Sequence, residues 1–194
     1  TVDPGARIYL HADAPLVIDG SLRVNGTRTD SVIFTGDRLD KEYRDLPASW
    51  PGIYFRGSSR DNQLRFARVL NAYQALVADQ PSPNAAAKLD LRECLIDNSY
   101  ETGILGIGSS IRAVNCLISN CGLNILIANG GNYDFTHCTV ASYSNIYILH
   151  KNPVLAVSNW DSTQAGIVSY PLRADFTNNI FWGDFGTVEN EVVV

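Results

Sequence analysis

The chain has 194 residues, of which 45% are hydrophobic and 18% charged, a composition typical of folded globular proteins rather than disordered segments. The formal net charge of −5 argues against nucleic acid as a partner, because nucleic-acid binding needs a basic face. No apolar run approaches the roughly 20 residues that a membrane-spanning helix requires, so the sequence predicts no transmembrane segment.

The first part of the chain contains short runs in which apolar and polar residues alternate, separated by Asp-Gly and Asn-Gly pairs. The apolar bursts lie at residues 6–10, 16–18, 22–24 and 32–34. Alternation with a period of two predicts strands, and these pairs are typical of tight turns. We therefore expect several short strands joined by tight turns in this part of the chain.

Residues 37–51 interrupt this pattern. Most residues from Asp37 to Asp45 are charged, and an apolar run resumes only at Ile53. A long connection of this kind inside a compact β-structure is either a functional loop or a solvated cover.

A short motif around a cysteine then recurs along the chain. Three copies, at residues 93–98, 115–120 and 137–142, follow one another at a period of about 22 residues, which is typical of repeat architectures. A degenerate copy at residues 178–183 follows after a longer interval. Three short strands per repeat, without a helical segment, predict a coil whose successive turns stack about 4.8 Å apart. A β-sandwich also has closely spaced turns, but it has no reason to repeat side-chain identities at a fixed period.

The repeat is interrupted in several places. Residues 149–173 stretch one turn to nearly double length, and residues 81–87 form a smaller excursion. His150, at the start of the longer one, is a candidate for contact with a partner. We expect any function of the chain to lie at the two large interruptions, 37–51 and 149–173.

A resemblance to a known family is carried by residues 2–8 and 20–27, and more specifically by residues 34–40 followed by Trp50-x-Gly52-Ile53. Over essentially its whole length the chain resembles the right-handed parallel β-helix proteins of the pectate-lyase-like superfamily. Within them it is similar to a group of uncharacterised cell-envelope β-helix lipoproteins of Gram-negative bacteria.

The resemblance implies an all-β fold: one right-handed parallel β-helix (solenoid) domain over residues 1–194, with turns of about 22 residues. It also implies a location in the periplasm or at the outer-membrane surface. In that group a lipid-anchored region precedes the helix and further turns follow it. We therefore expect this chain to be a segment of a longer solenoid that stacks end to end on another segment or chain.

The cysteines are predicted to be structural. Cys94, Cys116 and Cys138 fall in one column, and small apolar side chains of this kind fill a narrow core. Cys121 falls at a corner, where we expect its thiol to be the most accessible. No cysteine or histidine spacing fits a zinc site, so the sequence predicts neither a metal nor a cofactor.

A second column, the charged column, contains Asp90, Arg112, Asp134 and Asp175. Asp90, Arg112 and Asp134 are candidate catalytic residues, because carboxylates two turns apart would be about 9.6 Å apart, near the inverting-glycosidase range. Arg112 between the two carboxylates would, however, keep both ionised and leave no general acid. The pattern therefore favours a solvated charge ladder.

The connection over residues 37–50 is the best candidate for a binding site. Its candidate binding residues combine carboxylates, guanidinium groups and aromatic rings: Asp37, Arg38, Asp40, Tyr43, Arg44 and Trp50. Sugars are bound by apolar stacking and multiple hydrogen bonds, which such side chains provide. The alternative is a cover in which arginine–aspartate pairs fix the loop.

Three functions remain open at this point. The first is a non-catalytic cell-envelope module that binds a polysaccharide or an envelope protein through the 37–50 loop. The second is a carbohydrate-active enzyme, a polysaccharide lyase or glycoside hydrolase working at the charged column. The third is a structural subunit of an outer-membrane assembly.

Overall fold

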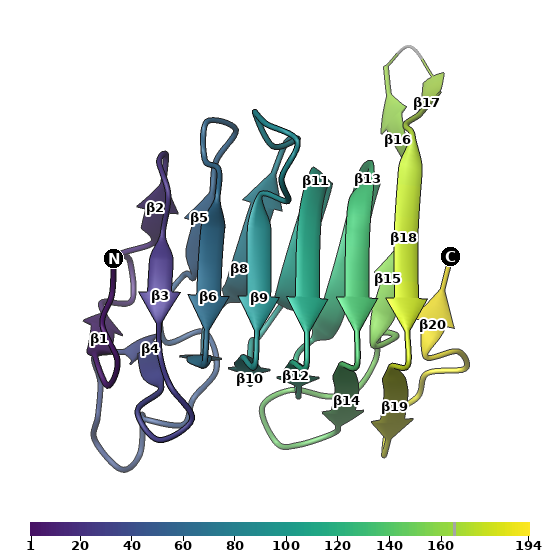
Figure 1. Cartoon of the computed structure of the whole chain (residues 1–194). Coiled ribbons are helices and arrows are strands. Elements are labelled where there is room, and N and C mark those ends of the chain that lie inside the picture. Colours follow the sequence, from purple (N-terminus) through teal and green to yellow (C-terminus); the bar gives the residue numbers. More distant parts are fainter. Residues whose placement is uncertain (165) are drawn as a thin grey trace.

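The structure, a computed structural model, describes residues 1–164 and 166–194, and every regular element in these residues is a β-strand (Figure 1). Among these described residues, all strand pairs but one are parallel. The expected all-β class with parallel strands is therefore confirmed. In the described part of the chain, no helix is long and apolar enough to cross a membrane.

Seven strands form the first sheet, all of them parallel. In their order across the sheet they are β1 (Arg7–Leu10), β4 (Val32–Gly36), β7 (Ala67–Leu70), β10 (Leu95–Asp97), β12 (Leu117–Ser119), β14 (Thr139–Tyr143) and β19 (Ile180–Asp184). Each of these strands comes from a different part of the chain, and the order follows the sequence.

Eleven strands form the second sheet, which contains two ladders joined by the long strands β11 (Thr102–Val114) and β13 (Leu123–Thr136). The first ladder also contains β2 (Leu16–Ile18), β5 (Ile53–Phe55), β8 (Gln74–Asp79), β15 (Leu155–Val157) and β20 (Val192–Val193). The second also contains β3 (Arg23–Asn25), β6 (Asn62–Arg65), β9 (Leu89–Arg92) and β18 (Leu172–Thr177). The antiparallel pair β16 (Trp160–Thr163) and β17 (Gly166–Ser169) projects beside them.

The register of the first sheet reproduces the period of the motif in the middle of the chain. Leu95 pairs with Leu117, and Leu117 pairs with Thr139, so each strand meets the equivalent position of the next repeat. On either side the interval along the chain is longer, since Leu95 also pairs with Arg68, and Thr139 with Ile180. The stretched turn predicted after residue 149 accounts for the second of these increases.

Residues with a left-handed backbone mark the corners between strands. One corner of successive repeats is formed by Phe66, Glu93, Asn115, His137 and Asn178, all with φ between 46° and 55°. Another is formed by Asn71, Asn98 and Asn120, with φ between 51° and 62°. Asparagine tolerates this conformation better than most residues. The recurrence of asparagine in the motif thus has a backbone cause.

One apolar cluster lies between the sheets, with members from both, and it contains Cys94, Cys116 and Cys138. The prediction that these thiols face the core is confirmed. Cys121, expected to be the accessible thiol, is also buried, because its thiol turns inward and donates to the Ser119 carbonyl oxygen at 3.2 Å. All four cysteines are free.

Candidate functional site

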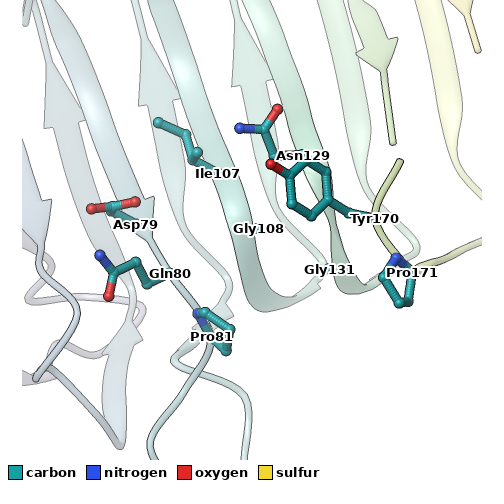
Figure 2. A pocket seen from close by; sticks show the side chains of 9 residues that line it. All are labelled: Asp79, Gln80, Pro81, Ile107, Gly108, Asn129, Gly131, Tyr170 and Pro171. Atoms are coloured by element: carbon teal, nitrogen blue, oxygen red, sulfur yellow. The ribbon is translucent and has the colours of Figure 1, made fainter. Parts of the chain in front are cut away.

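A cleft lies where β11 and β13 bend at glycines, between the β8–β9 connection and the segment that follows β17 (Figure 2). The pairing of β11 with β13 shifts register between Ile107 and Ser109. Gly131 has a φ of 118°, and a Cβ there would lie 2.3 Å from the Ser109 carbonyl oxygen. Only glycine allows this bend, which opens a hollow in the edge of the sheet.

The cleft has a volume of about 530 Å³, within the range of small-molecule sites. Its lining residues, all labelled in Figure 2, are Asp79, Gln80, Pro81, Ile107, Gly108, Asn129, Gly131, Tyr170 and Pro171. Strand β8 supplies the first of them, β11 and β13 supply the floor, and the residues after β17 supply the far wall.

Three planar polar side chains line this apolar hollow: Asp79, Gln80 and Asn129. Within residues 1–164 and 166–194, none of the three makes a side-chain hydrogen bond or ion pair. Figure 2 shows Asp79 and Gln80 on one side, Asn129 on the other, and Ile107 between them. The polar groups of Asp79 and Asn129 are therefore free to bind a ligand that enters the cleft, whereas the Gln80 amide packs against Gly57, where a Cβ would lie 2.5 Å from Gln80 Oε1.

Tyr170 supplies an aromatic ring beside Asn129 (Figure 2). Its backbone nitrogen donates to the Asn159 carbonyl oxygen at 2.6 Å, which ties it to the start of the β16–β17 hairpin. A Cβ on Gly130 would lie 2.9 Å from the Cβ of Tyr170. The Gly130–Gly131 pair thus lets the tyrosine approach the bend of β13 closely.

A second hollow of about 350 Å³ adjoins the first and shares Pro81, Gly108, Gly131 and Pro171 with it. Its other lining residues are uncharged, and most carry hydroxyl or amide groups: Ser82, Asn84, Ala85, Ala86, Ala87, Ser109, Ser110 and Asn132. The Ser109 hydroxyl is buried without a hydrogen-bond partner in the described residues. The two hollows together form a continuous cleft, of which the first hollow is the more apolar end and the second the more polar end.

Lys88 holds the backbone at the edge of the cleft, where Asp79 ends strand β8. Its side chain is completely buried, and Nζ donates to the carbonyl oxygens of Asp79, Arg56 and Gly57 at 2.6, 3.0 and 3.3 Å. Burial lowers the pKa of Lys88, and the negative charge of Asp79 opposes this shift. The ammonium group therefore joins the end of β8 to the start of β9, where Asp79 enters the cleft.

The charged column is aligned as predicted, since Arg112 pairs in register with Asp90 and with Asp134, and Asp134 with Asp175. The expected bridging by Arg112 is wrong. Arg92, further along the same strand as Asp90, instead binds Asp90 through two hydrogen bonds of 3.1 Å. Among the described residues Arg112 forms no ion pair. Same-strand neighbours are nearer to each carboxylate than the long Arg112 side chain.

Asp134 and Asp175 are likewise held on their own strands. Thr136 Oγ1 donates to Asp134 at 3.0 Å, and Arg173 lies 2.7 Å from Asp175. None of the charged column lines the cleft. The candidate catalytic residues Asp90, Arg112 and Asp134 thus lie outside the hollow that the structure forms.

The predicted binding residues of the 37–50 loop do not form one site: most lie at its exposed tip, whereas Trp50 is buried. At its tip, the Arg38 guanidinium lies 3.4 Å from the centre of the Tyr43 ring and 3.7 Å from Asp40. Arg44 pairs with the adjacent Asp45 at 3.2 Å. Asp37 is exposed. The exposed charges therefore bind one another, as the alternative of a cover with arginine–aspartate pairs anticipated.

Trp50 requires a correction, because it was expected to form an aromatic platform. Its side chain is 0% exposed, and Nε1 donates to the Leu70 carbonyl oxygen at 2.9 Å. A buried indole with its one donor satisfied cannot stack on a sugar. Asn71 and Asn98 hold the rest of the loop by donating to the carbonyl oxygens of Arg44 and Asp45.

His150 also requires a correction, since it was expected to face a partner. Its side chain is buried, with Nε2 at 3.1 Å from Glu191 Oε2. A Cβ on Gly183 would lie 2.1 Å from the imidazole, so the backbone packs directly on the ring. His150 thus joins the 144–154 connection to the residues just before β20.

The sequence did not predict the polar side chains of the cleft, although two features of the sequence indicated where the cleft lies. One is the Gly130–Gly131 pair within an apolar strand, which indicates a bulge or a close backbone approach. The other is the pair of excursions at 81–87 and 149–173, the second of which contains Tyr170. Neither signal names Asp79 or Asn129, which meet only through the fold.

Comparisons with known proteins give no guide to the cleft: the chain matches no protein-family model, no curated protein and no solved structure. Within the described residues, no group of three or more His, Cys, Asp or Glu side chains could hold a metal ion.

Proposed function

We propose that the two sheets are the faces of a right-handed parallel β-helix, with each turn giving one strand to each of three ladders. The parallel pairing, the strand order that follows the sequence and the repeating register support this proposal. The resemblance to the pectate-lyase-like superfamily supports it from the sequence. Parallel strands linked in sequence make right-handed connections almost without exception.

We further propose that the chain is a non-catalytic module that binds a glycan in the cleft. The observation that carries this proposal is the pair of planar polar side chains, Asp79 and Asn129, left without hydrogen-bond partners in the described residues on either side of Ile107. A sugar presents hydroxyl groups at its rim and C–H groups on its faces. Amide and carboxylate groups bind the hydroxyls, while Tyr170 and Ile107 contact the C–H faces.

A binding role fits the cleft better than hydrolysis does. Glycoside hydrolysis ordinarily needs two carboxyl groups on either side of the scissile bond. Asp79 is the only carboxylate among the described residues that line the two hollows. The location in the cell envelope that the resemblance implies would bring this cleft close to envelope polysaccharides.

The proposal is tested by a glycan-binding screen that compares the wild type with Tyr170→Ala. Removal of the ring is expected to weaken binding of any retained glycan about tenfold, the loss of about 1.4 kcal/mol. Tyr147→Ala is the matched control, because Tyr147 is exposed in the 144–154 connection and does not line the cleft. Binding that is lost equally in both variants would contradict the assignment to the cleft.

A parallel assay addresses the non-catalytic part of the proposal. The wild type is incubated with each retained glycan, and new reducing ends and unsaturated products are measured. We expect neither to accumulate above the buffer control. Turnover that survives Tyr147→Ala and is lost in Asp79→Asn would show that the module is an enzyme.

A further inference from the structure

We infer that the cleft selects neutral oligosaccharides and rejects their uronate counterparts, an inference that rests on the proposed function. Asp79 is the only charged side chain that lines either hollow among the described residues. A second carboxylate, brought by an acidic sugar, would therefore meet a carboxylate and no cation that it could contact directly. The other polar groups, supplied by serine, asparagine and glutamine, suit hydroxyl groups.

The positive charge of Lys88 offsets part of the Asp79 charge, but its ammonium group cannot pair with a ligand. Its ammonium group is completely buried, and its three hydrogen bonds to carbonyl oxygens use all three of its donors. It lines neither hollow. Arg56, whose carbonyl oxygen Lys88 binds, directs its own guanidinium to Asp19 at 3.3 Å. Neither of these two cations is thus free to bind an acidic sugar in the cleft.

The shape of the cleft supports an oligosaccharide rather than a single sugar. The hollows of about 530 and 350 Å³ share four residues, so one ligand can occupy both. Asp79, Ile107 and Asn129 come from the successive strands β8, β11 and β13, so Asp79 and Asn129 are two strands apart, about 9.6 Å, with Ile107 between them (Figure 2). An oligosaccharide bound against Tyr170 can therefore place a neighbouring sugar unit at the Asp79 carboxylate.

The size of the expected discrimination follows from the repulsion between two carboxylates. At about 5 Å this repulsion weakens binding by about fourfold in water and by more than about a hundredfold at the dielectric constant of a protein surface. Because the cleft is open to water and Lys88 offsets part of the Asp79 charge, we expect a neutral oligosaccharide to bind up to about fourfold more tightly than the same oligosaccharide with uronate residues. The ratio should fall as salt is added.

The test is calorimetric titration with matched pairs, such as galacto-oligosaccharides against oligogalacturonates and gluco- against glucuronate-containing oligosaccharides. In the wild type the neutral member is expected to bind more tightly. Asp79→Asn, which keeps the shape and removes the charge, should bring the ratio close to one. Asn129→Asp, which adds a carboxylate to the facing wall, should increase it. Asp175→Asn, which lies on β18 outside the cleft, is the control and should leave the ratio unchanged.

The outcomes separate the two proposals. If neither member of any pair binds, the glycan-binding function itself fails, and the inference fails with it. If glycans bind but the uronate binds as tightly as its neutral partner, or Asp79→Asn leaves the ratio unchanged, the inference is wrong while the function stands.

Discussion

Lys88 illustrates how one buried charge can define the edge of a binding cleft. Its Nζ joins the carbonyl oxygens of Arg56 and Gly57, which follow β5, to that of Asp79 at the end of β8. A buried ammonium is tolerated only when its hydrogen bonds are satisfied. The side chain thereby fixes the backbone of Asp79. An uncharged side chain of similar length would remove a donor from all three carbonyl oxygens, of which that of Arg56 also accepts from the Ser59 backbone nitrogen at 2.9 Å.

Lys88→Met is therefore expected to lower the free energy of unfolding by about 2–3 kcal/mol, because hydrogen bonds to a charged group are lost and carbonyl oxygens are left unpaired. Urea unfolding followed by circular dichroism measures this change. Lys41→Met, an exposed lysine of the 37–51 connection, is the control and should change stability by less than about 0.5 kcal/mol. Equal effects of the two substitutions would contradict the role given to Lys88.

Cys121 gives a prediction for alkaline pH. Burial raises the pKa of the Cys121 thiol to about 12, whereas the pKa of a thiol in the unfolded chain is about 8.5. Above that pH the unfolded state binds fewer protons than the folded state, so stability falls as pH rises toward 12. Between about pH 7 and about pH 10, the free energy of unfolding should therefore decrease by about 1–2 kcal/mol less for Cys121→Ala than for the wild type. Parallel stability curves for the two proteins would contradict this.

At the scale of the element, the connection between β4 and β5 combines a buried anchor with an exposed tip. Trp50 packs in the core and forms a bridge with Ala72, while Arg38 and Tyr43 bind each other at the surface. In Figure 1 this connection lies below the sheets, whereas the β8–β9 connection and the β16–β17 hairpin rise above them. The loop first expected to bind and the cleft thus lie at opposite edges.

Trp50→Ala is expected to destabilise the fold by about 3–5 kcal/mol, the usual cost of deleting a large buried aromatic side chain. Tyr43→Ala, in the same connection but at its exposed tip, should cost less than about 1 kcal/mol. Thermal unfolding of both variants gives the comparison. A stable Trp50→Ala protein with altered glycan binding would restore the platform that the sequence suggested.

The cysteine spacing was sufficient to align Cys94, Cys116 and Cys138, because a repeated side-chain pattern requires repeated local geometry. It was not sufficient to bring Asp79 and Asn129 to one cleft, on either side of Ile107. Their meeting depends on a register shift in β11 and on an excursion of irregular length, neither of which has a periodic signature. The prediction for Trp50 was wrong for a different reason: an indole can serve in a core or as a platform for a ligand, and only its burial in the folded structure distinguishes the two.

At the scale of the whole molecule, the proposed coil implies that a deletion of one complete repeat leaves the remaining strands in register. Residues 117–138 span one turn of that coil, and their removal would place Thr139 where Leu117 now pairs with Leu95. Every other ladder would also close in register. A deletion of half this length would move strands out of their ladders and put apolar side chains on the wrong face.

We therefore expect the deletion of residues 117–138 to fold with a β-type circular dichroism spectrum and a cooperative thermal transition, and the deletion of residues 117–127 to fail to do so. The protein that lacks residues 117–138 should not bind glycans, because Asn129 and Gly131 of the cleft are deleted. If both deletions fold equally well, or both fail, the coil with turns of this length is wrong.

Chemical-shift mapping tests the central claim, glycan binding in the cleft, most directly. A ¹⁵N-labelled chain of 21.2 kDa is titrated with neutral oligosaccharides at millimolar concentration, and the backbone amide shifts are followed. We predict that the amides that move lie at residues 79–80, 107–110, 129–132 and 170, while those of residues 37–49 stay fixed. Shifts confined to residues 37–49 or to the charged column, or no shifts with any neutral oligosaccharide, would contradict the account.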